Sequence, residues 1–585
     1  MTTTSKEPSA HDGGVPCPNG VLHDIIIVGA GPCGLAVAAR LREQNPAAIF
    51  TDEEHRRFHW IKRHGKKMAL RHDRRGRVSG AADAPARSDY NMVVLDADHD
   101  DWMGRWNHLF KTFDIKHLRS PMFWHVDPND RDSLLSKAYV QGREKELMEI
   151  KNCVGKEVSK HMKKKRRKYV GGKGESRVDI NERDRNDYFN PTQALFYDHC
   201  SDVVGRYGLQ AGNLIHKERV LDISYAPVSG ISVTDERLFT VRTNKGIRYA
   251  PIVVVAVGPG NQPRIPQIPG MVPIGTPSTT CTTPSSQPPT QPPPPQTSHA
   301  MQIHTFPDPT LTEKLASGRG RDTNILIIGG GLTSAQLADL ALRKGVGTVW
   351  QLMRGPLRVK QFDVDLAWMG KFRNVEQARF WQAESDAERL SLLKEARGGG
   401  SVTPGYYRVL KGHVEGGMLR VFERTRMTGA RFEEAEGVWR VETCPEVCQG
   451  EGGLPPMDYI YFATGVETDF AALPWLQTML ASHPIEGYGG FPCLNDDLMW
   501  KDGVPLFMAG RLAALKLGPS APNLGGARLA AERIAWGIEE VVRRECRLLH
   551  GGEDGADSPE EDRELVDYYA SGEGSMFRSL AEVAA

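Results

Sequence analysis

The fold is decided by the sequence D-I-I-I-V-G-A-G-P-C-G at residues 24–34, and a related sequence, N-I-L-I-I-G-G-G-L-T-S, follows at residues 324–334. Each begins with an apolar run that suits a parallel strand buried on both faces. In such patterns the first glycine allows a tight turn, the second lets the backbone approach a pyrophosphate, and the third lets the helix pack on the strand. The phosphates then lie against free amides at the helix N-terminus. The sequence therefore predicts two dinucleotide sites in one chain.

The residues around the first pattern support a nucleotide site. Residues 35–41 predict a helix, with Pro32 near its start and a proline shortly after its end. The next predicted strand covers residues 47–50, and Asp52 follows it at about 20 residues from the third glycine, where an acid binds the adenosine ribose. The segment 56–70, which contains Trp60, is predicted to line the cofactor ring; ordinary core packing is the alternative interpretation.

The second pattern differs in ways that indicate which dinucleotide it binds. Its third glycine is replaced by Ser334, which is still small. Arg354, with Arg358 nearby, follows the next strand at the position where an acid otherwise stands. Arginine there accommodates a 2′-phosphate, which predicts NADPH rather than NADH; ordinary surface charge is the alternative. Because two dinucleotides in one chain usually exchange a hydride, we expect FAD at the first site and NADPH at the second.

Composition is that of an ordinary globular protein. The chain has 585 residues, 40% hydrophobic content and a net charge of +1, which predicts two or three domains and gives no overall basic field for nucleic acid or membrane. Its nine cysteines form no paired framework or zinc pattern. The polar N-terminus and the lack of a long uninterrupted apolar run predict a soluble, cytoplasmic protein. The basic run at residues 163–168 is predicted to be solvated surface, with a polyanion-binding patch as the alternative.

The pattern along the chain predicts one nucleotide domain inserted into another. We expect a disordered N-terminus over 1–20, the first part of the FAD domain over 21–262 with a basic loop at 160–175, and a Pro/Thr/Ser-rich low-complexity insertion over 263–300. The NADPH domain follows over 321–457, with one charged helix predicted at 375–396. The chain then returns to the FAD domain over 458–550 and ends in an acidic tail, 551–585. Strands that end in glycine, such as the one before Gly465, mark the crossings between the domains, and the last segment carries Gly510 and Asn523 back to the flavin.

Together these motifs resemble the class B flavoprotein monooxygenases. The sequence is most similar to the lysine/ornithine N-hydroxylase-like and oxidative-stress-induced growth inhibitor-like FAD/NAD(P)-binding proteins. The resemblance implies an α/β fold of two Rossmann-like domains, as in glutathione reductase, with the NADPH domain inserted into the FAD domain. The residues expected to bind the cofactors are Gly29, Gly31, Pro32, Gly34, Asp52, Trp60, Gly329, Gly331, Ser334, Arg354, Gly465, Gly510 and Asn523.

The resemblance also implies a reaction. NADPH reduces FAD, the reduced flavin and O2 give a C4a-(hydro)peroxyflavin, and one oxygen passes to nitrogen or sulfur of a small molecule. No catalytic side chain and no metal are predicted, because the cofactor carries the difficult step. An NADPH oxidase or reductase on the same scaffold, and a flavin-binding regulatory protein with little turnover, are the alternatives.

Three departures from related enzymes narrow this interpretation. The Baeyer–Villiger fingerprint is incomplete around His304, which disfavours ketone oxygenation. Arg511 stands where many flavoproteins have an aspartate that binds the ribityl chain. Cys33 is alone in its turn, and a redox-active cysteine pair is missing from the first half of the sequence, which disfavours the disulfide reductases.

Overall fold

A computed structural model of the chain describes residues 15–17, 20–44, 46, 48, 69–71, 78–80, 90–151, 153–155, 180–210, 212, 214–232, 236–258, 263–271, 296–369, 373–447 and 453–549. The chain divides into two compact units, Met1–Ala535 and Trp536–Ala585. Both glycine patterns lie in the first unit, and the account below concerns that unit. The basic run at 163–168, residues 272–295 of the Pro/Thr/Ser-rich insertion and the acidic tail fall outside the described residues.

The glycines of the first pattern come directly after one of the inner strands of a six-stranded sheet. Its order is β11 (Ile215–Lys217), β6 (Met92–Asp96), β3 (Ile25–Val28), β15 (Ile252–Val255), β26 (Val504–Met508) and β25 (Met499–Lys501). All neighbouring pairs are parallel except β25 with β26. The residues of β3 are apolar and buried because the strand is covered on both faces. Helix α1 (Pro32–Arg42) follows it and is buried from Gly34 to Leu41.

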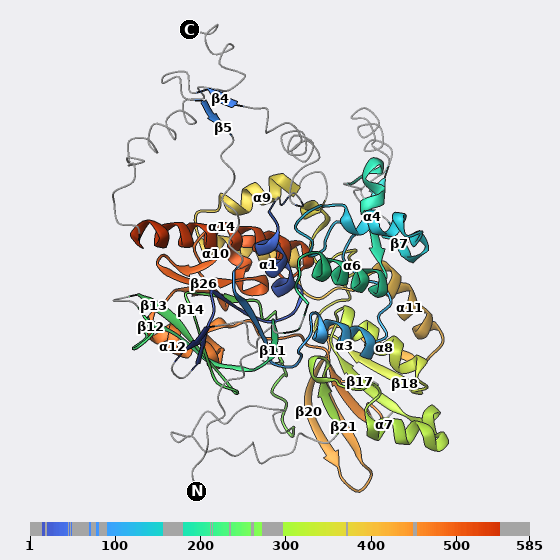
Figure 1. Cartoon of the computed structure of the whole chain (residues 1–585). Coiled ribbons are helices and arrows are strands. Elements are labelled where there is room, and N and C mark those ends of the chain that lie inside the picture. The colour runs from blue at the N-terminus through green and yellow to red at the C-terminus, as the bar shows by residue number, and fades with distance from the viewer. Residues whose placement is uncertain are drawn as a thin grey trace, which may run out of the picture. The chain divides into compact units, whose positions relative to one another are not determined.

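The second glycine pattern belongs to a five-stranded parallel sheet. Its order is β16 (Thr297–His299), β22 (Tyr459–Phe462), β17 (Asn324–Ile328), β18 (Thr348–Leu352) and β19 (Leu419–Phe422). Helix α8 (Leu332–Arg343) follows β17 and lies beside β17 and β18 (Figure 1). The strands of this sheet all lie between β15 and β25 in the sequence, so the second sheet is inserted into the first part of the fold.

The other described strands form a third sheet and several two-stranded sheets. The sheet has the order β1 (Val15–Cys17), β2 (Gly20–Leu22), β14 (Ile247–Ala250), β13 (Arg237–Thr243) and β12 (Val220–Pro227). The two-stranded sheets are β7 (Leu147–Glu149) with β10 (Phe189–Pro191), β20 (Arg426–Glu433) with β21 (Val438–Cys444), β23 (Gly487–Tyr488) with β24 (Phe491–Pro492), β4 (Ala69–Arg71) with β5 (Val78–Gly80), and β8 (Val154–Gly155) with β9 (Ile180–Asn181).

Helices surround the sheets. The remaining ones are α3 (Gly104–Thr112), α4 (Ser133–Val140), α6 (Gln193–Arg206), α7 (Pro309–Lys314), α9 (Arg373–Trp381), α10 (Asp386–Arg397), α11 (Pro404–Glu415), α12 (Gln477–Ser482), α13 (Ala514–Leu517) and α14 (Leu524–Leu549). The prediction of a single helix over 375–396 is wrong. The structure has α9 and α10 instead, because Ser385 begins a new helix by accepting a hydrogen bond from the amide of Glu388 at 3.2 Å.

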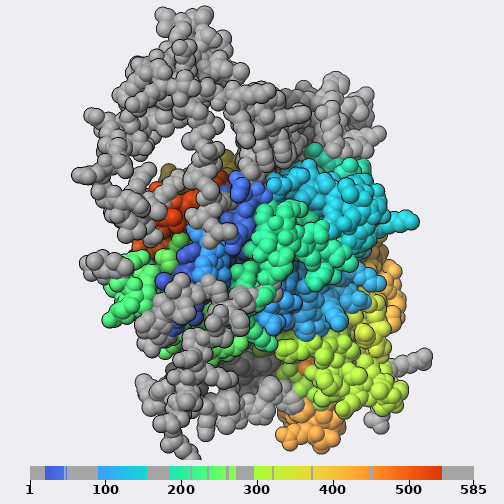
Figure 2. Space-filling model, in the orientation of Figure 1, coloured from blue at the N-terminus to red at the C-terminus, as the bar shows by residue number. Residues whose placement is uncertain are grey.

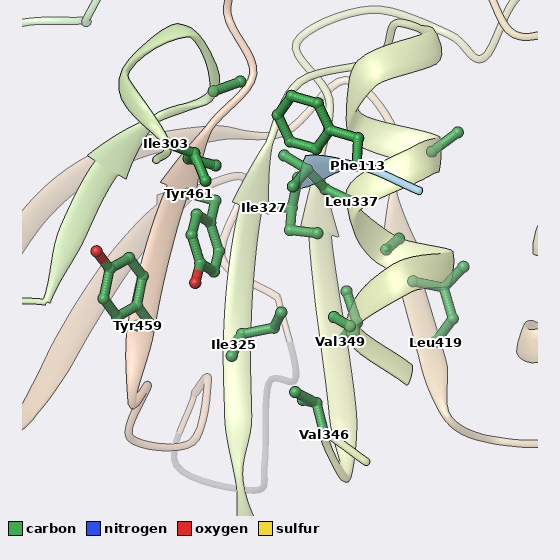
Figure 3. Close-up of a cluster of buried hydrophobic side chains, with 14 of the residues drawn as sticks. Phe113, Ile303, Ile325, Ile327, Leu337, Val346, Val349, Leu419, Tyr459 and Tyr461 are labelled. Carbon is green, nitrogen blue, oxygen red and sulfur yellow. The ribbon is translucent and has the colours of Figure 1, made fainter. Parts of the chain in front are cut away.

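The core of the second sheet includes side chains from the first part of the chain. Ile325, Ile327 and Leu337 are fully buried there, and Phe113, which follows α3, packs with them. Figure 3 shows the Phe113 ring beside Leu337 on the α8 side of the sheet. In the space-filling view, the blue surface around residue 100 adjoins the yellow-green surface of residues shortly after 300 (Figure 2). The two parts that carry the glycine patterns therefore share apolar contacts.

Some strands lie in a different sheet from the one that the predicted domain limits indicate. Tyr459–Phe462 pairs with β17, although the sequence analysis assigns it to the returning FAD domain, and β16 lies in the same sheet although its residues were predicted to belong to the insertion. β1 lies within the range 1–20, for which disorder is predicted, and it pairs with β2, of which only Gly20 belongs to that range. The other predicted limits stay predictions. In the described part of the chain, no helix is both long enough and apolar enough to cross a membrane, and no group of three or more potential ligands is placed to hold a metal ion.

Candidate dinucleotide sites

The first glycine loop is tightly enclosed by the protein except at its middle glycine. Gly29 has φ +112°, and a Cβ there would lie 2.5 Å from the carbonyl oxygen of Ala256. A Cβ at Gly34 would overlap the carbonyl oxygen of Gly29. At Gly31, by contrast, a Cβ would have no described atom within 4 Å. The loop therefore offers an open backbone approach at Gly31, as a bound pyrophosphate requires.

Helix α1 begins without a side-chain cap. Gly31 is its N-cap residue and Pro32 its first residue, and among the described residues no side chain accepts from the first amides. Helices α6, α10 and α11 instead use the side chains of Thr192, Ser385 and Thr403 for this purpose. The uncapped amides of α1 remain available to an anion at the positive end of the helix dipole.

Asp96 lies beside the first loop, although the spacing from the third glycine does not indicate it. It ends β6, the strand that pairs with β3, and one carboxylate oxygen accepts from the amide of Ala30 at 3.0 Å. The other oxygen accepts from the amides of Asp98 and His99, both at 3.0 Å. A carboxylate has about four lone-pair positions, so one remains for a ligand. The signal was present in the sequence as an apolar run, 92–95, that ends in an acid.

The predicted acid, Asp52, and the predicted ring-lining residue, Trp60, lie outside the described residues. Most of the expected strand 47–50 also lies outside the described residues, and in the described sheet β6 and β15 lie on the two sides of β3. The acid at the end of the adjacent strand is therefore Asp96.

The C-terminal segment returns to the first loop. Gly510, with φ +70°, follows β26, and a Cβ there would lie 3.1 Å from Sγ of Cys33 in the loop. Burial raises the pKa of the Cys33 thiol to about 12, so the thiol is neutral near pH 7. Arg511 donates to the hydroxyl of Thr468 at 3.0 Å. The side chain of Asn523, just before α14, turns to the inserted part and donates to Asp363 at 3.0 Å.

The second glycine loop has the same construction with a polar addition. Gly329 has φ +152°, and a Cβ there would lie 2.5 Å from the carbonyl oxygen of Ala463. Ser334 is fully buried, and its hydroxyl donates to the carbonyl oxygen of Gly331 at 2.7 Å. Gln351, which the sequence analysis also missed, donates to the carbonyl oxygen of Gly329 at 2.9 Å and to the Ser334 hydroxyl at 3.1 Å. Serine replaces the third glycine here because its hydroxyl is satisfied inside the loop.

Two predicted residues lie at the edges of this second loop. Arg354 is exposed two residues after β18, and within the described part of the chain its side chain forms no hydrogen bond or ion pair. Gly465 lies past the end of β22 with φ +80°, and its carbonyl oxygen accepts from the amide of Arg264 at 2.9 Å. The two crossing segments meet there through an antiparallel bridge between Pro263 and Val466. A hollow of about 390 Å³ is lined by this region, namely by Arg264, residues 466–469, Gly489 and Phe491.

Comparison with known proteins identifies the fold. No protein-family model and no curated protein sequence matches this chain. An ornithine N-hydroxylase from Kutzneria sp. 744, solved with reduced FAD, NADP+ and L-ornithine, matches 89% of this chain and 100% of its own, at 14% identity and a TM-score of 0.53. The reduced ornithine hydroxylase of Pseudomonas aeruginosa matches over the same shares at 17% identity and a TM-score of 0.51. This chain shares their fold.

A third solved structure agrees with these two. The FAD-bound cadaverine monooxygenase of Erwinia amylovora matches 89% of this chain and 95% of its own, at 14% identity and a TM-score of 0.52. The predicted fold class, two Rossmann-like domains with one inserted into the other, is thus confirmed. The predicted resemblance to N-hydroxylase-like flavoproteins is confirmed at the level of the fold.

Proposed function

We propose that this protein is an FAD- and NADPH-dependent monooxygenase that oxygenates nitrogen or sulfur of a small molecule. The observation that carries the proposal is the presence of two glycine loops, each at the carboxyl end of a parallel sheet, in one inserted fold. Ligands of open α/β sheets bind at those ends. The crossing segments between the two sheets contact each other through the Pro263–Val466 bridge and the hydrogen bond from Arg264 to Gly465.

The residues of the first loop fit FAD. Gly31 leaves room for the pyrophosphate, and the uncapped amides of α1 supply its hydrogen bonds. Asp96 has a lone-pair position free for a ribose hydroxyl and is fixed by three amides. Gly510 lets the C-terminal segment approach the loop closely. These contacts would hold the adenosine end of the cofactor in one position.

The residues of the second loop fit NADPH. Helix α8 also begins without a side-chain cap, at Gly331, and the Ser334 and Gln351 side chains hold the loop rigid. Arg354 is a cation without a protein partner in the described chain, at the end of the strand after the loop. A 2′-phosphate is the partner that this position takes in NADPH-dependent enzymes.

When bound, FAD supplies the redox chemistry, because its reduced form activates O2. The role of the protein is to bind and orient the cofactors and the substrate and to exclude side reactions. The Cys33 thiol, kept neutral by burial, is a poor nucleophile beside the first loop. The cysteines whose side chains are described are free thiols, namely Cys33, Cys153, Cys200, Cys444 and Cys493, which gives no support to a disulfide reductase. The similar Kutzneria structure is named as an N-hydroxylase, which favours nitrogen as the accepting atom.

The experiment follows the fate of oxygen. Purified protein is incubated with NADPH, 18O2 and a panel of primary amines and thioethers, and products are analysed by mass spectrometry. The proposal predicts one labelled oxygen atom in a product for each NADPH consumed with a true substrate. NADPH consumption that is matched by hydrogen peroxide for the whole panel would instead identify an oxidase and contradict the proposal.

A further inference from the structure

Arg119, in the segment after α3, binds the inserted part of the chain rather than its own. Its Nε donates to the carbonyl oxygen of Gln361 at 3.1 Å, and Nη2 donates to that of Lys360 at 2.9 Å. The same Nη2 lies 3.0 Å from the Ser401 hydroxyl, and Nη1 lies 3.5 Å from the Ser401 carbonyl oxygen. All four acceptors belong to the part that contains the second glycine loop.

The segments that Arg119 holds are themselves fastened to each other. The amide of Lys360 donates to the carbonyl oxygen of Val402, and the amide of Val402 donates to that of Arg358, both at 2.9 Å. Val359 and Val402 form the corresponding parallel bridge. The two segments therefore shift together if the guanidinium moves.

This fastened pair touches the second glycine loop. A Cβ built at Gly400 would lie 3.2 Å from Cα and 3.4 Å from N of Gly331, so the two backbones are nearly in contact. At the first loop, the equivalent glycine, Gly31, has no described neighbour within 4 Å of a Cβ. The space over Gly331 is consequently set by the position of Gly400 and of its neighbour Ser401.

A second connection joins the same region to the C-terminal segment. Asp363 accepts from Asn523 at 3.0 Å and pairs with Arg397 at 2.8 Å. Arg397 also donates to the carbonyl oxygen of Pro519 at 2.8 Å. Both parts of the first fold therefore hold the segments around Gly400, from Arg119 on one side and Asn523 on the other.

Arg119 is an unusual choice for a purely structural contact. Its hydrogen bonds go to neutral acceptors, and burial lowers its pKa to about 10, with partial compensation from Asp363. Arg119 is half-buried, and removing a cation from water without a directly bonded carboxylate costs free energy. The five donors of a guanidinium, however, hold several carbonyl groups in one fixed geometry, which a smaller group cannot do.

We propose that Arg119 is a positioning residue for NADPH. From the FAD part of the chain, it holds residues 400–401 at the height over Gly331 that admits the pyrophosphate of NADPH. The inference rests on the proposed assignment of the second loop to NADPH. It adds a specific residue of the first part that controls binding at the second, without contact to either cofactor.

The test is Arg119→Lys in the FAD-loaded protein. Lysine keeps the charge but has no planar fork to hold Lys360 and Ser401 together. Anaerobic stopped-flow reduction by NADPH separates the dissociation constant from the limiting rate of flavin reduction. We expect the dissociation constant to rise about 10-fold, as for the loss of one or two such hydrogen bonds. Flavin content and the limiting rate at saturating NADPH should stay within about twofold, by the same scale.

Arg143→Lys is the matched control. Arg143 also makes several hydrogen bonds, to Glu146 and Asp198, but all of them stay within the first part of the chain. We expect its NADPH dissociation constant to equal that of the unmodified protein. An unchanged constant in Arg119→Lys, or an equal rise in both variants, would overturn the proposal.

Ser401→Ala provides an independent readout if Arg119→Lys fails to retain FAD. It removes one acceptor of Arg119 from the side of the inserted part. A raised NADPH constant with full flavin content supports the proposal, and an unchanged constant overturns it. The proposed function is judged separately, by product formation in the unmodified protein. NADPH binding without an oxygenated product would contradict that function and leave the role of Arg119 standing.

Discussion

Asp96 is the residue on which the assignment of the first loop depends. Asp96→Asn removes the charge but keeps the shape. Because hydrogen bonds to a charged group contribute about 1.5–3 kcal/mol, we expect FAD affinity to fall about 10-fold or more. Asp98→Asn is the control, since that carboxylate is 43% exposed and pairs with Arg105 and Arg219. Titration of deflavinated protein with FAD measures both, and equal affinities would show that Asp96 does not hold the ribose.

Arg354 determines which nicotinamide dinucleotide is preferred. Arg354→Ala should raise the dissociation constant for NADPH about 10-fold, by loss of a charge-assisted phosphate contact, and leave that for NADH unchanged. Arg420→Ala serves as the control, because Arg420 lies over the Trp350 ring on the neighbouring strand. If Arg354→Ala weakens both dinucleotides equally, or neither, the arginine is ordinary surface charge.

Single residues also show where sequence reasoning stops. The glycines of both loops could be predicted because their role is local: a strand, a turn and a helix that are adjacent in the chain. Asp96 was missed because the chain between α1 and β6 is much longer than the usual link, so counting residues from the third glycine pointed to Asp52. Gln351 and Arg119 act through partners distant in sequence, and no periodicity or spacing indicates such contacts.

At the scale of elements, two glycines in the strand–turn–helix of the first loop allow effects on folding to be distinguished from effects on FAD binding. Gly34→Ala places a methyl group on the carbonyl oxygen of Gly29 and should destabilise the protein by about 1–3 kcal/mol, as overpacking does. The methyl group of Gly31→Ala would have no described neighbour within 4 Å, so the melting temperature of the flavin-free protein should not change. This methyl group nevertheless fills the approach to the pyrophosphate, and FAD binding should be lost.

Thermal unfolding and flavin content of the two variants decide between these effects. If Gly31→Ala retains FAD at the normal affinity, the open face at Gly31 is not the phosphate site.

Some of the other elements could be predicted from the sequence and some could not. Apolar strands that end in glycine were recognisable, whereas the break between α9 and α10 depends on a single cap at Ser385 within a charged stretch.

For the whole molecule, a buried histidine links stability to pH. Burial lowers the pKa of His199 to about 4, against partial compensation by Asp127, and its Nε2 lies 2.9 Å from the Ser133 hydroxyl. The unfolded chain binds this proton below about pH 6.5 and the folded chain only near pH 4, so stability falls as the pH drops through that window. Between pH 7 and pH 5, His199 alone should cost about 2 kcal/mol.

Chemical denaturation at the two pH values measures this loss. His199→Asn cannot titrate and should unfold with a pH dependence smaller by that amount. An unchanged pH dependence in the variant would show that His199 is not the group responsible. The measurement concerns folding alone and is independent of the proposed activity.

The central claim for the whole molecule is that one chain holds FAD and NADPH so that the second reduces the first. The most direct measurement is the absorbance spectrum of the purified, flavin-loaded protein mixed with NADPH in the absence of oxygen. The account predicts loss of the oxidised-flavin band with NADPH, and with NADH only at much higher concentration. A protein that purifies without flavin and does not take up added FAD, or a bound flavin that NADPH leaves oxidised, would contradict it.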